Sequence, residues 1–261
     1  MTFTRPALAA LALAASVAGC GGGSSASATP PPATPPASAD ISVLMFGNSH
    51  TDFNNLPGML SAMIRAARPG KSVSVVRGQE YMFLDERLTH APSLSLFNSL
   101  KWSAVVYQAQ KYSVSGAFDY SSTEAVEWVR MTRARPSIPV MFPEWPRRGV
   151  DETQRIYDLH VSIAARQEAC VAPVGQAWDL SGRRVPGLVL HADDGNHAAP
   201  AGSFLAALVL YASLTGESPL GLPALDGFPV DAATQARLRE VADEQVKLIP
   251  ARLHCPSTAR L

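Results

Sequence analysis

One serine and one aspartate–histidine pair stand where they could form a hydrolytic site. Ser49 follows an apolar run, within the tetrapeptide Gly-Asn-Ser-His, and Asp194 and His197 lie three residues apart late in the chain. A serine hydroxyl becomes a nucleophile when a histidine takes its proton, and a carboxylate fixes the tautomer of that histidine. Within one turn, Asp194 can reach the His197 ring. These residues therefore predict a Ser-His-Asp triad.

Two other interpretations of the same residues remain open. Serine is favoured at the start of helices, so Ser49 could simply cap a helix. Alternatively, nitrogen and oxygen ligands for a metal ion lie within seven residues, at His191, Asp193, Asp194 and His197. We prefer the triad, because no third histidine is nearby and a metal site would leave the serine turn without a role. We therefore expect no metal and no organic cofactor.

Apolar runs and helical patterns alternate along the chain around these residues. Strands are predicted at 41–46, 72–76, 104–108, 138–142 and 170–174. Helices are predicted at 56–67, 124–134, 153–168, 199–214 and 230–248. Parallel strands with helical crossovers indicate an α/β fold, a doubly wound three-layer sandwich with a five-stranded parallel sheet. Ligands bind such folds at the carboxyl ends of the strands, which is where Ser49 stands.

The N-terminus predicts export and lipidation. Residues 1–19 resemble a signal peptide, with Arg5 ahead of an apolar run too short to span a bilayer. The run ends Val-Ala-Gly-Cys, which looks like a bacterial lipobox that would place lipid on Cys20; an ordinary secretory signal is the alternative. Residues 20–39 lack charged and aromatic side chains, so we interpret them as a disordered Gly/Ser/Pro tether. The folded domain is then 40–261.

This interpretation also predicts where the protein works. A lipid-anchored domain would lie outside the cytoplasm in a bacterial cell envelope, on the periplasmic or the outer-membrane face. We expect it to be a monomer that contacts the membrane only through its anchor. With Cys20 carrying lipid, Cys170 and Cys255 remain, and in an oxidising compartment they could form a disulfide or stay free thiols.

Charge and composition exclude two classes of protein. The 261 residues include 22 Lys+Arg and 22 Asp+Glu, so the chain has no net charge, and it contains no basic stripe that would bind nucleic acid. Hydrophobic residues make up 47% of the chain and charged residues 17%, which indicates a folded domain rather than a disordered chain.

The two chemical blocks, taken together, resemble the SGNH (GDSL-type) hydrolases. Phe-Gly-Asn-Ser at 46–49 is similar to the first block of the bacterial branch that has Gly-Asn-Ser in place of Gly-Asp-Ser. Asp-Gly-Asn-His at 194–197, followed by Pro-Ala-Gly at 200–202, is similar to the last block. The resemblance covers about residues 42–220 and implies the flavodoxin-like fold of that family.

The resemblance also implies a role for each residue of the site. Ser49 would be the nucleophile, His197 the general base and Asp194 its orienting partner. The oxyanion hole would use the backbone N–H of Ser49 and that of Gly78, which follows the second strand. Gly78 could instead be an ordinary turn glycine.

The third family block, Gly-x-Asn-Asp, differs in this chain. The third strand is followed by Gln108-Ala109-Gln110, which places Gln110 at the position of the asparagine. A glutamine amide offers the same N–H donor on a longer side chain. We therefore expect Gln110, rather than Gln108, to be the third oxyanion donor.

His50 and Trp145 are candidates for contact with the substrate. His50 adjoins the nucleophile, and Trp145 follows the fourth strand, where it could instead pack inside the fold. The predicted function is a serine esterase that removes short acyl groups, acetyl first, from carbohydrate or similar small esters. The alternative is a non-catalytic surface lipoprotein that binds glycans with the same fold, which only the altered third block supports.

Overall fold

The computed structural model describes residues 38–250, 252–257 and 261. The predicted signal peptide (1–19), the lipidated Cys20 and nearly all of the tether (20–39) lie outside the described residues, so those expectations stay predictions. In the part of the chain that the structure describes, no helix combines the length and the hydropathy that a membrane span requires.

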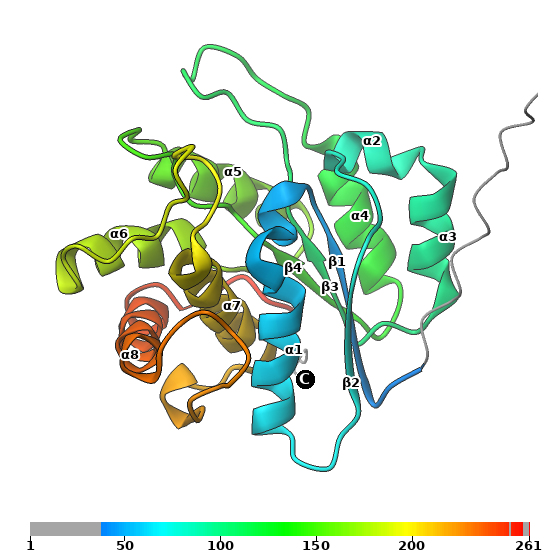
Figure 1. Ribbon diagram of the computed structural model, residues 1–261. Helices are drawn as coiled ribbons and strands as arrows, with labels where there is room; N and C mark the ends of the chain where they lie inside the picture. The colour runs from blue at the N-terminus through cyan, green and yellow to red at the C-terminus, as the bar shows by residue number, and fades with distance from the viewer. Residues whose placement is uncertain (1–37, 251, 258–260) are drawn as a thin grey trace, which may run out of the picture. The chain divides into compact units, whose positions relative to one another are not determined.

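A five-stranded, entirely parallel sheet forms the centre of the fold (Figure 1). Its strands are β1 (Ile41–Phe46), β2 (Val73–Arg77), β3 (Ala104–Tyr107), β4 (Ile138–Met141) and β5 (Cys170–Val171). They lie in the order β2-β1-β3-β4-β5, which confirms the predicted doubly wound α/β fold. The strand order reverses between β1 and β3. In such sheets ligands bind in the crevice beyond the carboxyl ends of the strands at that reversal.

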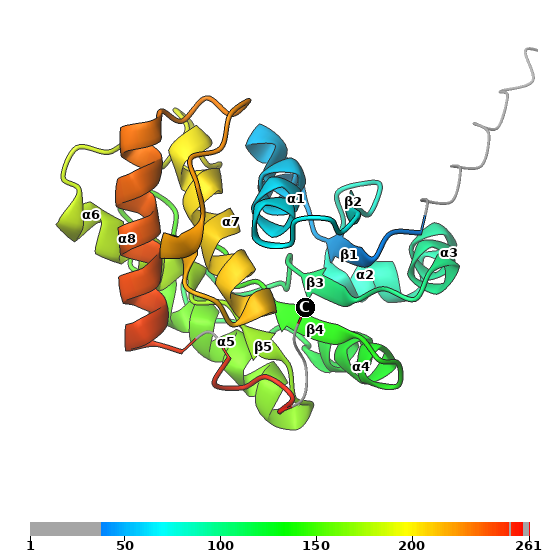
Figure 2. The ribbon, with the colours of Figure 1, turned by 90° about the horizontal axis from the view of Figure 1, so that it is seen from below.

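Helices cover both faces of the sheet and make three layers (Figure 2). One face carries α1 (Leu56–Ala67), α6 (Val174–Arg184), α7 (Pro200–Thr215) and α8 (Ala232–Leu248). The other carries α2 (Leu84–Leu88), α3 (Ala91–Ser99), α4 (Thr123–Arg133) and α5 (Thr153–Arg166). Alternate β1 residues supply both cores: Val43 and Met45 face the first group of helices, while Leu44 and Phe46 face the second.

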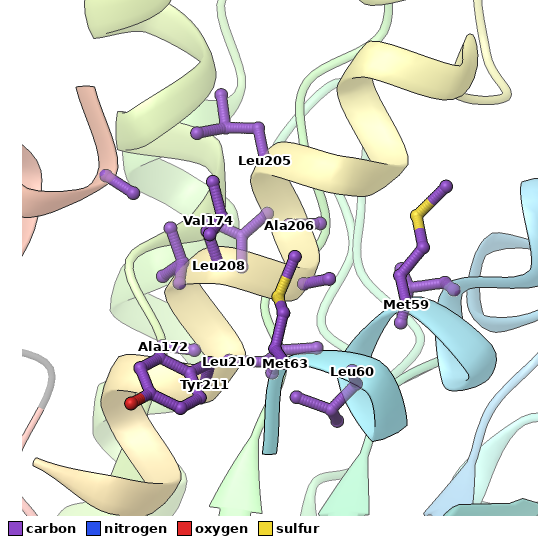
Figure 3. Close-up of a cluster of buried hydrophobic side chains, with 14 of the residues drawn as sticks. Met59, Leu60, Met63, Ala172, Val174, Leu205, Ala206, Leu208, Leu210 and Tyr211 are labelled. Atoms are coloured by element: carbon purple, nitrogen blue, oxygen red, sulfur yellow. The ribbon is translucent and has the colours of Figure 1, made fainter. Parts of the chain in front are cut away.

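Helix α7 is the most enclosed element of the larger core. Every residue from Ala201 to Thr215 is buried, because α1, α6, α8 and the sheet surround the helix. Met59, Leu60 and Met63 of α1 belong to the same buried cluster as Leu208, Leu210 and Tyr211 of α7 (Figure 3). Removing a buried leucine side chain from such a site costs about 2–5 kcal/mol. This packing fixes the amino end of α7, which follows the His197 loop.

Every predicted strand and helix is present, with ends displaced by at most three residues. The largest displacement is in β5, which ends at Val171 because Pro173 cannot donate to a sheet ladder. Three helices were not predicted. Helix α2 has only five residues, α3 carries a proline in its first turn, and α6 begins within the residues expected to end the fifth strand.

Cys170 and Cys255 form a disulfide, which is one of the two alternatives left open by the sequence. Cys170 is the first residue of β5, so the bond attaches the C-terminal segment to the amino end of that strand. The two cysteines are 85 residues apart.

Candidate active site

The turn that carries Ser49 begins where β1 ends. Ser49 is the first residue of a 3-10 helix, η1 (Ser49–Thr51), and Asn48 is its cap, with the side-chain oxygen accepting from the N–H of His50 at 3.0 Å. Because Asn48 takes the capping role, the Ser49 hydroxyl is left for other partners. A Cβ on Gly47 would lie 2.4 Å from Thr51 Cγ2 and 2.5 Å from Gln108 Oε1, so only glycine fits there.

Ser49, His197 and Asp194 form a continuous hydrogen-bonded chain. Ser49 Oγ lies 2.7 Å from His197 Nε2, and His197 Nδ1 lies 2.5 Å from Asp194 Oδ2. The ring nitrogen that faces the carboxylate must donate, so Nε2 is the nitrogen able to accept the serine proton. Ser49 and His197 are partly buried, whereas the Asp194 side chain is 49% exposed.

The hydrogen bonds that reach Asp194 hold the pKa of its carboxyl well below the usual range. The largest contribution is the bond from His197, followed by the backbone N–H groups of Asn196 and His197, each 2.9 Å from Oδ1. The carboxylate therefore stays ionised wherever the protein is folded near neutral pH, which keeps it available to a protonated His197.

The loop that carries Asp194 and His197 is tied down on the side of β4. The Trp145 indole N–H donates to the Asn196 carbonyl at 2.9 Å, and the Arg148 backbone N–H donates to the Gly195 carbonyl at 2.8 Å. Trp145 is only 1% exposed and stacks on Trp178 at a centroid distance of 4.6 Å. The expectation that Trp145 is a substrate platform is therefore wrong: the ring is enclosed, and it supports the loop.

His50 also has no surface to offer a substrate, contrary to expectation. Its side chain is buried, with ring centroids 5.0 Å from Trp145 and 5.3 Å from His197. The residue that does lie on the exposed side of the base is Phe53, which sequence reasoning missed. It stacks on the His197 ring at a centroid distance of 4.0 Å, and 38% of it is exposed.

The Ser49 N–H points away from the 3-10 helix that it begins. The preceding carbonyl, that of Asn48, accepts from both the N–H (3.1 Å) and the hydroxyl (2.7 Å) of Thr51, so it points into the 3-10 helix. The C=O and N–H of a trans peptide point in opposite directions. The Ser49 N–H therefore points out of the helix, and as the first residue of that helix Ser49 has no acceptor within it.

Gly78 does not supply the second donor that the resemblance implied. Its N–H donates to the Met45 carbonyl at 2.8 Å, because the β1–β2 ladder continues one residue beyond β2. The position requires glycine for another reason: a Cβ would lie 2.6 Å from the Phe46 ring. Gly78 is thus a packing glycine.

Neither glutamine of the third block donates to the site. Gln110, the expected donor, is buried, and its amide nitrogen donates to the carbonyls of Lys111 and Ser121, both at 2.9 Å, which uses both of its N–H groups. Gln108 is wholly buried below the turn that carries Ser49, so a substrate could not reach it. The loop after β3 turns away at Ala109, which adopts a left-handed backbone with φ +70°.

Arg87 is a functional candidate that the sequence analysis did not identify. It is wholly buried, and its guanidinium donates to the carbonyls of Gly47 and Glu80 at 2.8 and 2.5 Å. Burial lowers its pKa to about 10, so it stays charged at neutral pH. One signal could have revealed it: Arg87 follows Leu84 by three residues, so in a helix it shares the face of a buried leucine.

The residues of the alternative metal site do not converge in the structure. His191 Nε2 donates to the Pro146 carbonyl at 2.7 Å, while Asp194 binds His197. Within the described ranges, no group of three or more His, Cys, Asp or Glu side chains is arranged to hold a metal ion.

Comparisons with known proteins place the fold among SGNH hydrolases. No family model matches the chain, and no curated protein matches it. Among solved structures, a protein from Slackia heliotrinireducens assigned as an SGNH hydrolase is 28% identical, with a TM-score of 0.53, over 66% of this chain and 97% of its own.

Two structures with lower sequence identity share the fold. A DUF4886 family protein from Bacteroides uniformis ATCC 8492 is 18% identical, with a TM-score of 0.59, over 81% of this chain and 96% of its own. A variant of Axe2, an acetyl xylan esterase from Geobacillus stearothermophilus, is 14% identical, with a TM-score of 0.51, over 72% and 98%. The five-stranded parallel sheet of this chain is thus the sheet of the SGNH hydrolase fold.

Proposed function

We propose that this protein is a serine ester hydrolase that removes short acyl groups, acetyl first, from carbohydrate or similar small esters. The observation that carries the proposal is the hydrogen-bonded chain from Ser49 through His197 to Asp194 at the carboxyl end of β1. The 28% identical neighbour assigned as an SGNH hydrolase supports the hydrolase class, and the acetyl xylan esterase with this fold is why we name acetyl esters of carbohydrate.

The first half-reaction acylates the serine. Ser49 Oγ attacks the ester carbonyl carbon while its proton passes to His197 Nε2, and Asp194 stabilises the resulting imidazolium. The carbonyl oxygen becomes an oxyanion that accepts a hydrogen bond from the Ser49 N–H. The intermediate then collapses: the bond to the alcohol oxygen breaks, and His197 gives its proton to the leaving alcohol.

The second half-reaction releases the acid. A water molecule loses its proton to His197 Nε2 and attacks the acyl carbon. Collapse of this intermediate returns the proton from His197 to Ser49 Oγ and frees the carboxylic acid. Phe53, stacked on His197 and partly exposed, would lie against the bound acyl group or alcohol.

One observation favours the non-catalytic alternative. The Gly78 N–H and both Gln110 amide N–H groups are occupied by protein acceptors, so the Ser49 N–H is the one expected oxyanion donor that stays available. The loss of one such donor typically costs about 2.7–4 kcal/mol of transition-state stabilisation. A weak esterase, or a glycan-binding protein that retains the fold, would each fit this arrangement.

Labelling of the serine separates these two functions. The full chain should react with a fluorophosphonate probe and hydrolyse p-nitrophenyl acetate, and Ser49→Ala should lose both properties. Ser115→Ala, which changes an exposed serine in the loop after β3, is the matched control and should lose neither. A Ser49→Ala variant that keeps its activity, or a wild-type chain that resists the probe, would exclude the esterase.

We also propose that Cys20 carries the lipid anchor and that the domain works in the cell envelope as a monomer. The sequence ending Val-Ala-Gly-Cys supports this proposal. Metabolic labelling with an alkyne fatty acid should mark the protein, and Cys20→Ser should abolish the label and release the protein from the membrane fraction. A label retained by Cys20→Ser would contradict the anchor.

A further inference from the structure

The peptide group between Gly47 and Asn48 is held at both ends by buried side chains. Its carbonyl accepts from Arg87 Nη2 at 2.8 Å, and its N–H donates to Gln108 Oε1 at 2.9 Å. This peptide immediately precedes the one that carries the Ser49 N–H. Its orientation therefore sets the directions in which the Ser49 hydroxyl and the Ser49 N–H point after the end of β1.

Each of these two side chains is itself fixed by further contacts. Gln108 is wholly buried, and its amide nitrogen donates to a carboxylate oxygen of Glu144, in the segment after β4. Since the amide must accept on one side and donate on the other, its orientation is unambiguous. Glu144 therefore prevents the amide from rotating, in the way that Asp194 fixes the His197 ring.

Arg87 lies on the opposite side of the peptide and joins two loops. Besides Gly47, it donates to the carbonyls of Gln79 and Glu80 and to the hydroxyl of Ser93. Among the described residues no carboxylate lies within ion-pair distance of Arg87, so the buried cation is solvated by backbone carbonyls. A buried charge that meets fixed dipoles holds them tightly, because losing any one of them leaves the charge less well solvated.

We propose that Arg87 and Glu144 are positioning residues for Ser49. The Arg87 cation holds the carbonyl of Gly47 by donating to it. The Glu144 anion orients the Gln108 amide, which accepts from the N–H of Asn48. The proposal rests on the proposed esterase function. Arg87 is wholly buried, so it can act on the substrate only through the residues it binds, and Glu144 acts through the Gln108 amide. Together they keep the serine hydroxyl and the Ser49 N–H in line with the ester carbonyl, where a displacement of about 1 Å can cost about 100-fold in rate.

The test compares Glu144→Gln with Glu152→Gln. Both changes remove one carboxylate charge from the β4–α5 segment, but Glu152 binds Arg147, whereas Glu144 is the carboxylate that accepts from the Gln108 amide. Glu144→Gln should lower kcat for p-nitrophenyl acetate about 10-fold or more with KM within about 2-fold, while Glu152→Gln leaves kcat within about 2-fold. The pH at which activity rises should stay unchanged in both variants.

A double-mutant cycle shows whether Glu144 acts through Gln108. Gln108→Leu removes both amide contacts at similar volume, and we expect kcat to fall about 100-fold. Adding Glu144→Gln to Gln108→Leu should lower kcat no further, because the carboxylate has lost the group it orients. Fully additive losses, or a kcat that either single variant leaves unchanged, would overturn the proposal.

Arg87 needs a measurement that does not depend on folding yield. Arg87→Lys keeps a charge but not the fork that binds several carbonyls, so kcat per fluorophosphonate-labelled site should fall about 10-fold with KM retained. If kcat per labelled site equals wild type, or if the variant cannot be labelled because it does not fold, Arg87 is a stability residue and that half of the proposal fails. Ser49→Ala remains the separate test of the esterase itself.

Discussion

The backbone conformation of the turns differs between the two edges of the central sheet. At the carboxyl edge, four residues other than glycine adopt positive φ: Asn54 and Asn55 after β1, Glu80 after β2 and Ala109 after β3. No other such residue occurs in the described part of the chain. At the amino edge, the tight turn that leads into β2 uses a glycine, Gly70, at φ +83°. Strained backbone is therefore confined to the edge that carries Ser49, as is typical of functional sites.

Exposed aromatic side chains show the same asymmetry. Five aromatic side chains are each more than a third exposed, and all lie between the carboxyl end of a strand and the α-helix that follows it: Phe53, Tyr81, Phe83, Phe118 and Tyr120. The amino edge instead has the disulfide at Cys170. The carboxyl edge carries the candidate active site and the amino edge carries the disulfide, so changes at the two edges should affect different measurements.

The largest predicted effect is a loss of kcat when the charge of Asp194, at the carboxyl edge, is removed. Asp194→Asn keeps the shape of the side chain but no longer forces His197 Nδ1 to be the donor, so kcat should fall about 10⁴-fold. The free energy of unfolding should change little, because the side chain is half exposed. Steady-state kinetics and urea unfolding measure both quantities. A kcat within 10-fold of wild type would remove Asp194 from the triad.

Removing the disulfide should lower the stability of the fold and leave kcat almost unchanged. Replacing Cys170 and Cys255 together by serine should lower the free energy of unfolding by about 2–4 kcal/mol, because the bond restricts the unfolded chain over 85 residues. kcat should stay within about 2-fold, since two strands, β3 and β4, separate β5 from β1 in the sheet. A large loss of kcat in protein that is still folded would show that the two edges are coupled.

Acid should lower the free energy of unfolding through a histidine that lies outside the candidate site. His160 is a buried residue of α5, and burial lowers the pKa of its imidazole to about 4, against 6.5 in a model peptide. The unfolded state therefore binds the proton first, so stability should fall as pH drops from about 6.5 to 4, by roughly 1.4 kcal/mol per pH unit. Unfolding of His160→Gln should lack this slope. If wild type and variant show equal slopes, another group is responsible.

The smallest predicted effect tests the strain itself. Ala109→Gly removes a left-handed residue with a Cβ, so the free energy of unfolding should rise by about 1 kcal/mol. Ala104→Gly, in β3 where the backbone is extended, should lower it by a similar amount or more. A lower stability for Ala109→Gly would show that its backbone conformation is not strained.

The sheet, the place of Ser49 at its carboxyl edge and the short Asp194–His197 contact could be predicted because each depends on local sequence. Ile41–Phe46 is apolar except for Ser42, and a serine three residues after the end of such a strand must stand at the carboxyl edge. Asp194 and His197 are close enough in sequence to meet within one turn. The resemblance supplied the pairing of that turn with Ser49, across 148 residues.

The parts that could not be predicted depend on long-range contacts. Nothing in the sequence near Gln108 shows that Glu144 will bind its amide, 36 residues away. Gly78 matches the family position by sequence, but whether its N–H is available depends on where the β1–β2 ladder stops. Gln108 and Gln110 differ in their partners because the backbone reverses at Ala109, and alanine gives no signal for that conformation.

The chain enters and leaves the fold at the amino edge. Asp40, directly before β1, donates its backbone N–H to Ser72 Oγ at the turn before β2, and the N–H of Leu261 donates to the Leu214 carbonyl near the end of α7. Ser49 lies at the other end of β1. A solid support attached to the folded domain next to Asp40 or at Leu261 would therefore begin at the edge opposite Ser49, which makes these the points of choice when a bulky ester is to reach the serine.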